Sequence, residues 1–206
     1  MGSFQIKGGI SLKGEIKPQG AKNECLQILC AVLLTSEEVI VNNIPDIIDV
    51  NRLIQILKSL EVKVEKIGQG SYKFKADNLN LNYLESEGYK IDGKGLRGSI
   101  MLVGPLLTRF GKGSIPRPGG DKIGRRRLDT HFHGLELLGG DFRYDKKESF
   151  YTIECKKLKG TSILLDEPSV TGTANILMAS VLADGVTTIY NAACEPYIQQ
   201  LCLMLN

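Results

Sequence analysis

The densest group of reactive side chains lies in the segment PGGDKIGRRRLD, residues 118–129. Its Pro-Gly-Gly start disfavours both a helix and a flat strand, which predicts a loop. Near the tip of this loop stands one carboxylate, Asp121, and it is followed by the cations Lys122, Arg125, Arg126 and Arg127. One acid beside a cluster of anion-binding donors is typical of a lid that closes over an anionic substrate. A solvated basic turn is the alternative.

Three predicted helices begin with groups that favour anions. Their starts are Lys22-Asn23, Arg97-Gly98-Ser99 and Ser169-Val170-Thr171-Gly172-Thr173. A helix N-terminus offers unpaired N–H donors and a partial positive charge, which suit phosphate or carboxylate. If the helices pack in parallel about a pseudo-threefold axis, their starts meet on one face, and Lys22, Arg97 and Arg126 converge on one or two anionic ligands. In the alternative, Asn23 and Ser169 are ordinary N-caps and the cations are solvated.

These helices belong to an internal repeat with a period of roughly 75 residues. Each copy contains an apolar helix that should be central, a turn, a short strand and an amphipathic helix. The apolar helices are predicted at 20–34, 96–107 and 169–182, and the strands that follow them at 39–45, 113–116 and 186–191. The amphipathic helices are predicted at 53–60, 128–138 and 197–205, with further strands at 62–65, 72–75, 142–144 and 151–154. The third copy stops at Asn206 as its helix ends, which predicts that the chain is part of a longer protein.

The composition is that of a soluble globular protein, with 42% hydrophobic and 24% charged residues among 206. The formal net charge of +3 is too small for general nucleic-acid binding, so the basic side chains must act through local clustering. The longest apolar run, residues 26–34, is too short to span a membrane, and the N-terminus lacks the apolar core of a signal peptide. We therefore expect a cytoplasmic protein that binds neither membranes nor nucleic acids.

Neither the cysteines nor the histidines suggest a metal site. The five cysteines form no CxxC pair and most have apolar neighbours, where cysteine behaves as a small hydrophobe. His131 and His133 point to different sides of a predicted helix, and His131 is expected to be structural or to support a neighbouring group. Walker, dinucleotide-binding, nucleophile-elbow and zinc motifs are absent from the sequence. We expect no metal and no cofactor.

The ordered motifs resemble those of the bacterial UDP-N-acetylglucosamine enolpyruvyl transferases. The matching segments, spread over essentially the whole chain, are Gly20-Ala21-Lys22-Asn23, Leu96-Arg97-Gly98-Ser99-Ile100, Gly104-Pro105-Leu106-Leu107, Pro118-Gly119-Gly120, Ile123-Gly124, Arg126, Leu128-Asp129, Ser169-Val170-Thr171-Gly172-Thr173 and Glu195-Pro196. The shikimate-pathway enolpyruvyl transferases share the fold, but the segments at 21–23 and 118–129 look like the amino-sugar branch.

The resemblance implies an α/β fold of repeated βαβαββ units, with buried parallel helices and outer sheets. It implies a two-domain protein about twice as long as this chain. Residues 1–20 would form N-terminal strands that pack with the second domain, and residues 21–206 the first domain with its third repeat truncated. The reaction would transfer the enolpyruvyl group of phosphoenolpyruvate to the 3-hydroxyl of UDP-N-acetylglucosamine, the first committed step of peptidoglycan synthesis. The isolated domain is expected to be inactive or nearly so.

The resemblance also assigns roles to residues. Asp121, Lys22 and Arg97 are the expected catalytic residues, and Lys22 and Asn23 would contact phosphoenolpyruvate and the sugar. Arg97 and Arg126 would hold anionic groups. The uridine side would be lined by Arg126, Arg127, Leu128, Asp129 and Thr130, and the nucleotide contacted by Glu167, Pro168, Ser169, Val170 and Thr171. Arg127 replaces a proline that is usual in the family.

Asp121 stands where most family members have a lid cysteine, the proton donor to the enolpyruvyl methylene and the target of fosfomycin. Free aspartate has a pKa far below neutral, and the neighbouring cations oppose protonation further. Lid closure over two polyanionic substrates acts the other way, through desolvation and like charge. We therefore predict that Asp121 becomes a competent acid only in the closed ternary complex, and that the enzyme resists fosfomycin.

Two other function classes stay open at this point. One is a nucleic-acid-binding module that uses the basic loop at 122–127, although the chain lacks an aromatic stacking set. The other is a non-catalytic half that interacts with another chain of similar fold.

Overall fold

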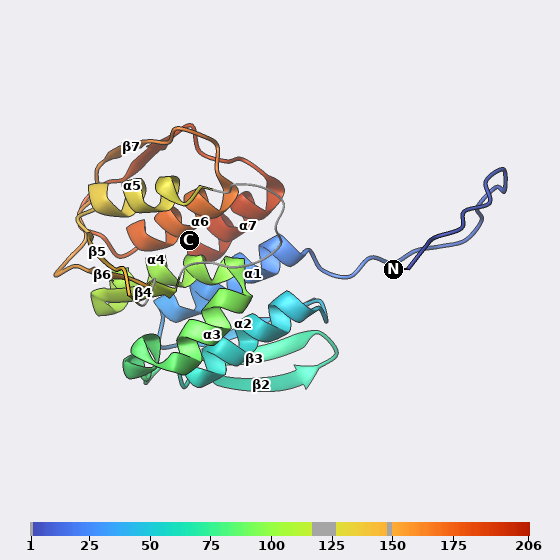
Figure 1. Ribbon diagram of the computed structural model, residues 1–206, viewed down its shortest axis with the longest axis horizontal. Helices are drawn as coiled ribbons and strands as arrows, with labels where there is room; N and C mark the ends of the chain where they lie inside the picture. The colour runs from blue at the N-terminus through green and yellow to red at the C-terminus, as the bar shows by residue number, and fades with distance from the viewer. Residues whose placement is uncertain (1, 117–126, 148–149) are drawn as a thin grey trace.

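The computed structural model describes residues 2–116, 127–147 and 150–206. Its compact body has helices at the centre and small sheets towards the outside (Figure 1). The first unit contains α1 (Lys22–Ala31), η1 (Val32–Leu34), β1 (Glu38–Val41), α2 (Ile48–Ser59), β2 (Lys63–Gly68) and β3 (Ser71–Lys75). The second contains η2 (Leu81–Glu85), α3 (Glu87–Gly95), η3 (Arg97–Leu102), α4 (Val103–Phe110), β4 (Lys112–Pro116), α5 (Asp129–Leu137), β5 (Asp141–Asp145) and β6 (Phe150–Glu154). The third contains β7 (Ser162–Leu164), α6 (Val170–Ser180), β8 (Thr188–Tyr190) and α7 (Pro196–Leu205).

The first two units form equivalent antiparallel sheets. Their strand orders are β1-β3-β2 and β4-β6-β5, so the last strand of each unit lies in the middle. The alternating sequence explains the pairing, because one face of each central strand must be buried. Phe74 on β3 is opposite Val39 and Val64, and Ile153 on β6 is opposite Phe142. The third unit contributes two parallel strands, β7 and β8. The predicted strands after the apolar and amphipathic helices are confirmed.

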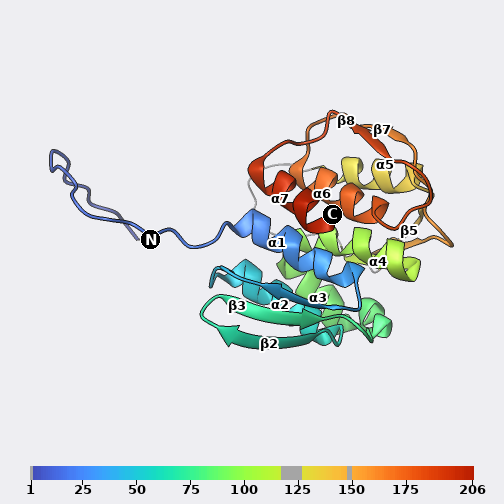
Figure 2. The same ribbon diagram turned by 180° about the vertical axis from the view of Figure 1, so that it is seen from behind.

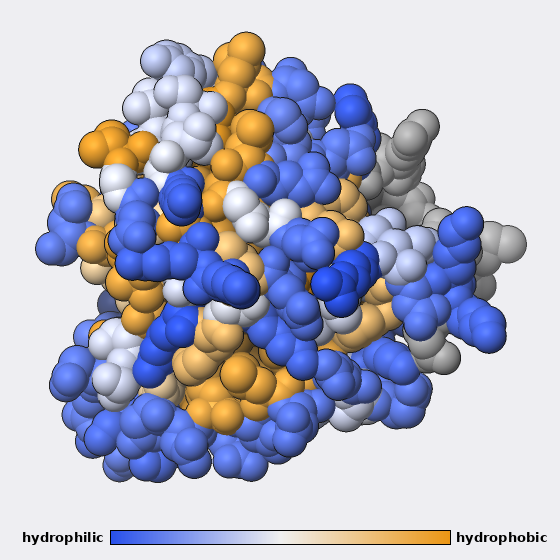
Figure 3. Space-filling view, turned by 90° about the vertical axis from the view of Figure 1, so that its left-hand side faces the viewer, coloured by the Kyte–Doolittle hydropathy of each residue, from blue (hydrophilic) through white to orange (hydrophobic). Residues whose placement is uncertain are grey.

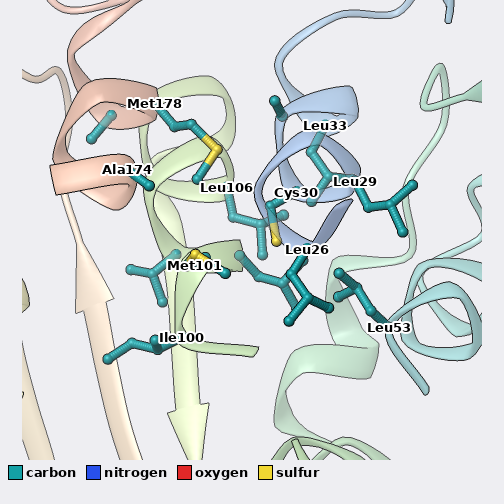
Figure 4. Packing of buried hydrophobic residues seen from close by; sticks show 14 of the residues in the cluster. Leu26, Leu29, Cys30, Leu33, Leu53, Ile100, Met101, Leu106, Ala174 and Met178 are labelled. Atoms are coloured by element: carbon teal, nitrogen blue, oxygen red, sulfur yellow. The ribbon is translucent and has the colours of Figure 1, made fainter. Parts of the chain in front are cut away.

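The central helices α1, α4 and α6 are apolar nearly all round, as the sequence predicts. Leu29, Cys30, Leu106 and Met178 are fully buried where these helices meet (Figure 4). Burying a leucine or methionine side chain contributes about 1.5–3 kcal/mol, so the packing of these helices contributes strongly to the stability of the body. Burial also raises the pKa of the Cys25 thiol on α1 to about 12, which leaves it unreactive at neutral pH.

Two glycines allow the outer and central helices to approach α6. A Cβ atom at Gly104 on α4 would lie 2.3 Å from the carbonyl oxygen of Asn175. A Cβ atom at Gly134 on α5 would lie 2.2 Å from Cδ1 of Ile176. Both distances are far shorter than a van der Waals contact. At Gly104 the obstacle is backbone, so the close contact of α4 with α6 requires glycine, whereas at Gly134 the Ile176 side chain would have to move.

The second buried helix differs from the prediction of one continuous helix. Residues 97–102 form the 3₁₀ helix η3, and α-helical geometry begins at Val103. Pro105 gives the physical reason, because it has no N–H to donate to the carbonyl of Met101. The helix α3 was not predicted, since it contains three glycines in nine residues. Ser86 caps it by accepting from the Tyr89 amide at 3.1 Å.

Residues 2–20 contain no helix or strand and extend away from the body (Figures 1 and 2). Apolar side chains are exposed along this segment, at Phe4, Ile6, Ile10, Leu12 and Ile16. The prediction that residues 1–20 form strands packed on a second domain stays a prediction, as does the division of the chain at residue 21.

The α/β fold class and the repeated units are confirmed. The first two units run helix, strand, helix and two strands, and the third runs strand, helix, strand and helix. Within the described ranges, the leading strand of a βαβαββ unit is seen only in the third unit, as β7.

The face at the left of Figure 1 mixes hydrophilic residues with several hydrophobic areas (Figure 3). Among the described helices, none combines the length and apolar character needed to cross a bilayer.

Candidate functional site

A cleft of about 640 Å³ lies where the starts of α1, η3 and α6 meet. The three helices come from three different units of the repeat. Lys22 and Asn23 enter it from α1, and Arg97 from η3. The start of α6 and the segment before it contribute Glu167, Ser169, Val170 and Thr171. The three helix starts therefore meet as the repeat predicts, with Lys22 and Arg97 beside them, whereas Arg126, the third cation of that prediction, lies outside the described residues.

The wall formed by α1 and α2 carries an exposed ion pair. Lys22 Nζ lies 2.9 Å from Oδ2 of Asp49, and the two side chains are 50% and 36% exposed. Asp49 lies in the first turn of α2, where a carboxylate is stabilised by the helix dipole. Next to it, the Arg52 guanidinium donates to the Gly95 carbonyl at 2.7 Å.

The start of α1 is not capped by a side chain. Ala21 is its N-cap, and Asn23 is the second residue of the helix. The alternative that Asn23 is an ordinary N-cap is therefore wrong. The first N–H groups of α1 are left for water or a ligand.

The start of α6 is capped, since Ser169 Oγ accepts from the Gly172 amide at 3.3 Å. For Ser169 the N-cap alternative is therefore correct. Its side chain nevertheless lines the cleft, together with Val170 and Thr171.

Arg127 is held by carboxylates at the rim. Its Nε lies 2.5 Å from Asp129 Oδ2, and its Nη1 lies 3.4 Å from Asp166 Oδ2. The hydrogen bond to Asp129, with the charges of Asp129 and Asp166, raises the pKa of Arg127. Arg97 Nη2 donates to the Arg127 carbonyl at 3.4 Å, which links the second helix start to this rim.

His131 lies at the inner end of the cleft and is 2% exposed. Its Nε2 lies 3.2 Å from Thr171 Oγ1 and its Nδ1 lies 3.1 Å from Asn175 Nδ2. Burial, together with the positive charge of Arg97, lowers the pKa of His131 to about 3. The imidazole is therefore neutral at physiological pH, as expected for a group that supports its neighbours. His133 is exposed, on another side of α5.

The predicted site residues fall into three groups. Those that line the cleft are Lys22, Asn23, Arg97, Arg127, Leu128, Glu167, Ser169, Val170 and Thr171. Asp129, Thr130 and Pro168 are close in sequence but do not line it. Asp121, Lys122, Arg125 and Arg126 lie outside the described residues.

Thr130 shows that a residue next to cleft residues in the sequence need not line the cleft itself. It is 4% exposed, and its hydroxyl donates to Asp166 Oδ1 at 3.2 Å. Its methyl carbon packs against Gly172, because a Cβ atom added at that glycine would lie only 2.8 Å from it. The side chain supports the contact between α5 and α6, and its predicted role beside uridine stays a prediction.

Sequence reasoning missed several cleft residues: Leu26, Gln27, Asp49, Arg52, Ile100, Met101 and Tyr197. Asp49 carried no signal, because the helix was predicted to begin only at residue 53, whereas α2 begins at Ile48. Gln27 carried one, because a polar residue interrupts the longest apolar run. It is 1% exposed and its amide finds no partner among the described residues.

Comparison with known proteins adds sequence relationships to this geometry. A family model described as EPSP synthase (3-phosphoshikimate 1-carboxyvinyltransferase) matches residues 6–206. The chain is 65% identical over 206 residues to a UDP-N-acetylglucosamine 1-carboxyvinyltransferase of Bacteroides fragilis, which covers all of this chain and 48% of the relative. It is 60% identical over 205 residues to the protein of that name from Porphyromonas gingivalis, covering 100% of this chain and 47% of the relative. The chain thus spans about half the length of the curated relatives it matches.

Solved structures show the same fold at low identity. The enolpyruvyl transferase NikO from Streptomyces tendae superposes with a TM-score of 0.76 at 17% identity, covering 96% of this chain and 45% of NikO. EPSP synthase from Acinetobacter baumannii superposes with a TM-score of 0.68 at 16% identity, covering 91% of this chain and 42% of that enzyme.

Proposed function

The chain belongs to the EPSP synthase family, and we propose that it is one domain of a UDP-N-acetylglucosamine 1-carboxyvinyltransferase. In this reaction the enolpyruvyl group of phosphoenolpyruvate passes to the 3-hydroxyl of UDP-N-acetylglucosamine, and phosphate leaves. The observation that carries the proposal is the 65% identity, over all 206 residues, to a relative with that name. As the first committed step of peptidoglycan synthesis, the reaction would serve cell-wall formation, cell shape and division.

The cleft offers the chemistry that two anionic substrates need. Lys22, Arg97 and Arg127 supply positive charge, and the starts of α1 and α6 supply backbone N–H groups. We assign Lys22 and Asn23 to phosphoenolpyruvate and the sugar, and the α6 start to the nucleotide. Asp121, outside the described residues, would donate the proton to the enolpyruvyl methylene.

The proposed reaction needs no cofactor, because a hydroxyl replaces a phosphate and no electrons are gained or lost overall. A second domain of the same enzyme is the proposed partner, since it would supply the base for the sugar hydroxyl and further arginines for phosphoenolpyruvate. We propose a cytoplasmic location, where the five cysteines, all of which are unpaired, stay reduced. Neither nucleic acid nor membrane is a proposed partner.

A chimeric enzyme tests the proposal. Residues 1–206 are joined to the remaining half of the Bacteroides fragilis relative, and phosphate release is measured with both substrates. We expect turnover that requires both UDP-N-acetylglucosamine and phosphoenolpyruvate and that falls by at least about 100-fold in Asp121→Ala, because general-acid catalysis contributes about this much. A folded chimera without turnover, beside an active Bacteroides fragilis parent, would contradict the proposal.

The same chimera tests the proposed resistance to fosfomycin. A carboxylate is a far poorer nucleophile towards the epoxide than a thiolate, so preincubation should leave the Asp121 enzyme active. Asp121→Cys should be inactivated with time. Covalent labelling of Asp121 by the drug would refute this part of the proposal.

A further inference from the structure

A buried chain of hydrogen bonds leads from the central helices to the cleft. Its root is Asn175 on α6, which is fully buried. Asn175 Oδ1 accepts from the Gly104 amide at 2.7 Å, and Nδ2 donates to the Ile100 carbonyl at 3.1 Å. The opposite orientation of the side-chain amide would set its NH₂ against the Gly104 N–H and its oxygen against the Ile100 carbonyl. Only one orientation therefore satisfies both backbone groups.

This orientation fixes the tautomer of His131. The second N–H of Asn175 faces His131 Nδ1 at 3.1 Å, so Nδ1 must accept and cannot carry a proton. In a neutral imidazole the proton is then on Nε2. Nε2 lies 3.2 Å from Thr171 Oγ1, so His131 donates and the threonine oxygen accepts.

The consequence appears at Thr171, in the first turn of α6. Its side chain is half-buried and lines the cleft. Because its oxygen accepts from His131, its own hydroxyl proton must point elsewhere, and among the described residues no acceptor receives it. Thr171 is thus prepared to donate a hydrogen bond into a cleft that already favours anions through a helix N-terminus.

We propose that His131 and Asn175 are positioning residues that hold the Thr171 hydroxyl as a hydrogen-bond donor to a diphosphate oxygen of the nucleotide sugar. The inference rests on the proposed function for the identity of the ligand. A diphosphate oxygen is a pure acceptor, so a donor fixed before binding loses little freedom when the complex forms. A ligand group that can only donate, such as an ammonium or an amide N–H, would face a donor at this point and be disfavoured.

The tautomer is measured first, on the ligand-free chain. The chain contains two histidines, so ¹⁵N-labelled imidazoles give two simple sets of resonances, with exposed His133 as an internal reference. We expect the His131 pattern of a neutral ring protonated at Nε2. A ring protonated at Nδ1 would overturn the inference, whatever ligand the cleft binds.

Binding is measured next, by calorimetry of the chimera with UDP-N-acetylglucosamine. Thr171→Val should weaken binding by about tenfold or more, as expected for a hydrogen bond to a charged group, and Thr171→Ser should restore it. His131→Gln places an amide near the position of Nε2 and should bind within about threefold of the parent. His131→Asn places its amide near Nδ1 and should weaken binding about tenfold, because it does not reach Thr171.

Combining variants separates positioning from a general loss of structure. If His131 acts through Thr171, His131→Asn should weaken binding no further in the Thr171→Val background. Thermal melting shows which proteins are folded, and the threonine variants test the donor even if a histidine variant does not fold. Normal binding by Thr171→Val would overturn this inference but leave the proposed function standing. So would an equal effect of His131→Asn in the parent and in the Thr171→Val background. Failure of the parent chimera to bind would instead refute the proposed function, and this ligand assignment with it.

Discussion

The two walls of the cleft use polar side chains in opposite ways. On the α1–α2 wall, Lys22 and Asp49 form an ion pair that water reaches from several sides. On the α5–α6 wall, His131 and Asn175 are buried and linked through hydrogen bonds to the backbone of the second unit. An exposed pair contributes about 0–1 kcal/mol, whereas each buried polar group left without a partner costs about 1–3 kcal/mol.

This difference separates an adjustable wall from a fixed one. Lys22 can exchange Asp49 for a phosphate or carboxylate at small cost, because both ends of the pair stay solvated. The α5–α6 wall cannot rearrange without leaving polar groups unpartnered in a dry interior. A cleft with one wall of each kind can hold part of a ligand in a fixed place while its cations adjust. Three predictions test this contrast.

The largest effect is expected from acid. Free histidine has a pKa of about 6.5, whereas that of His131 in the folded chain is about 3. Between these values the unfolded chain binds a proton that the folded chain excludes, so this contribution is full above pH 6.5 and is lost as the pH falls. The free energy of unfolding should decrease by about 1.4 kcal/mol per pH unit, or about 5 kcal/mol by pH 3.

Urea unfolding at pH 6.5, 5.5 and 4.5 measures this slope. In His131→Gln, the slope of the unfolding free energy against pH should be smaller than in the parent by about 1.4 kcal/mol per pH unit, and the same substitution at exposed His133 is the matched control. Equal pH slopes of the unfolding free energy in the parent and His131→Gln would show that the folded α5–α6 wall does not keep His131 unprotonated.

The next effect comes from removing the root of the buried network. Asn175→Ala leaves the Gly104 amide, the Ile100 carbonyl and His131 Nδ1 without their partner. We expect a loss of about 2–4 kcal/mol in the free energy of unfolding. In the matched control Asn51→Ala, the lost bond is an exposed one to Asp46, and the change should be below about 1 kcal/mol. Similar losses in both variants would remove the contrast between the walls.

The smallest effect is expected on the adjustable wall. Asp49→Asn removes the charge that faces Lys22 while keeping the shape of the side chain. The free energy of unfolding should change by less than about 1 kcal/mol, and the difference should shrink further in high salt. Urea unfolding at two salt concentrations measures it. A loss above about 2 kcal/mol would mean that this wall is structurally fixed as well.

The elements of both walls could be predicted from the sequence, but the contacts that set their character could not. Apolar runs located α1 and α6, and alternation located the strands, because these patterns repeat locally. Asn175 looked like one polar residue in an apolar helix. Its partners Gly104, Ile100 and His131 belong to the preceding unit, between 44 and 75 residues away in the chain. No local pattern encodes such a pairing.

The candidate site was predictable to the extent that it depends on helix starts. Lys22, Arg97 and Ser169 meet because equivalent positions of a repeat meet in space. Pro105, which shortens the second buried helix, was visible in the sequence, but its effect depends on where helical geometry begins. Asp49 and Tyr197 enter the cleft from the outer helices α2 and α7, and their approach depends on how those helices pack.

The most direct test of the account is calorimetric titration of the chimera with UDP-N-acetylglucosamine. Arg97→Ala removes a cation from the cleft, and Arg143→Ala removes one from β5, which lies outside it. We predict that the parent and Arg143→Ala bind alike, and that Arg97→Ala binds at least about tenfold more weakly, as expected for a charge-assisted hydrogen bond. Equal binding by all three proteins would contradict the claim that the meeting point of the three helix starts is the substrate cleft.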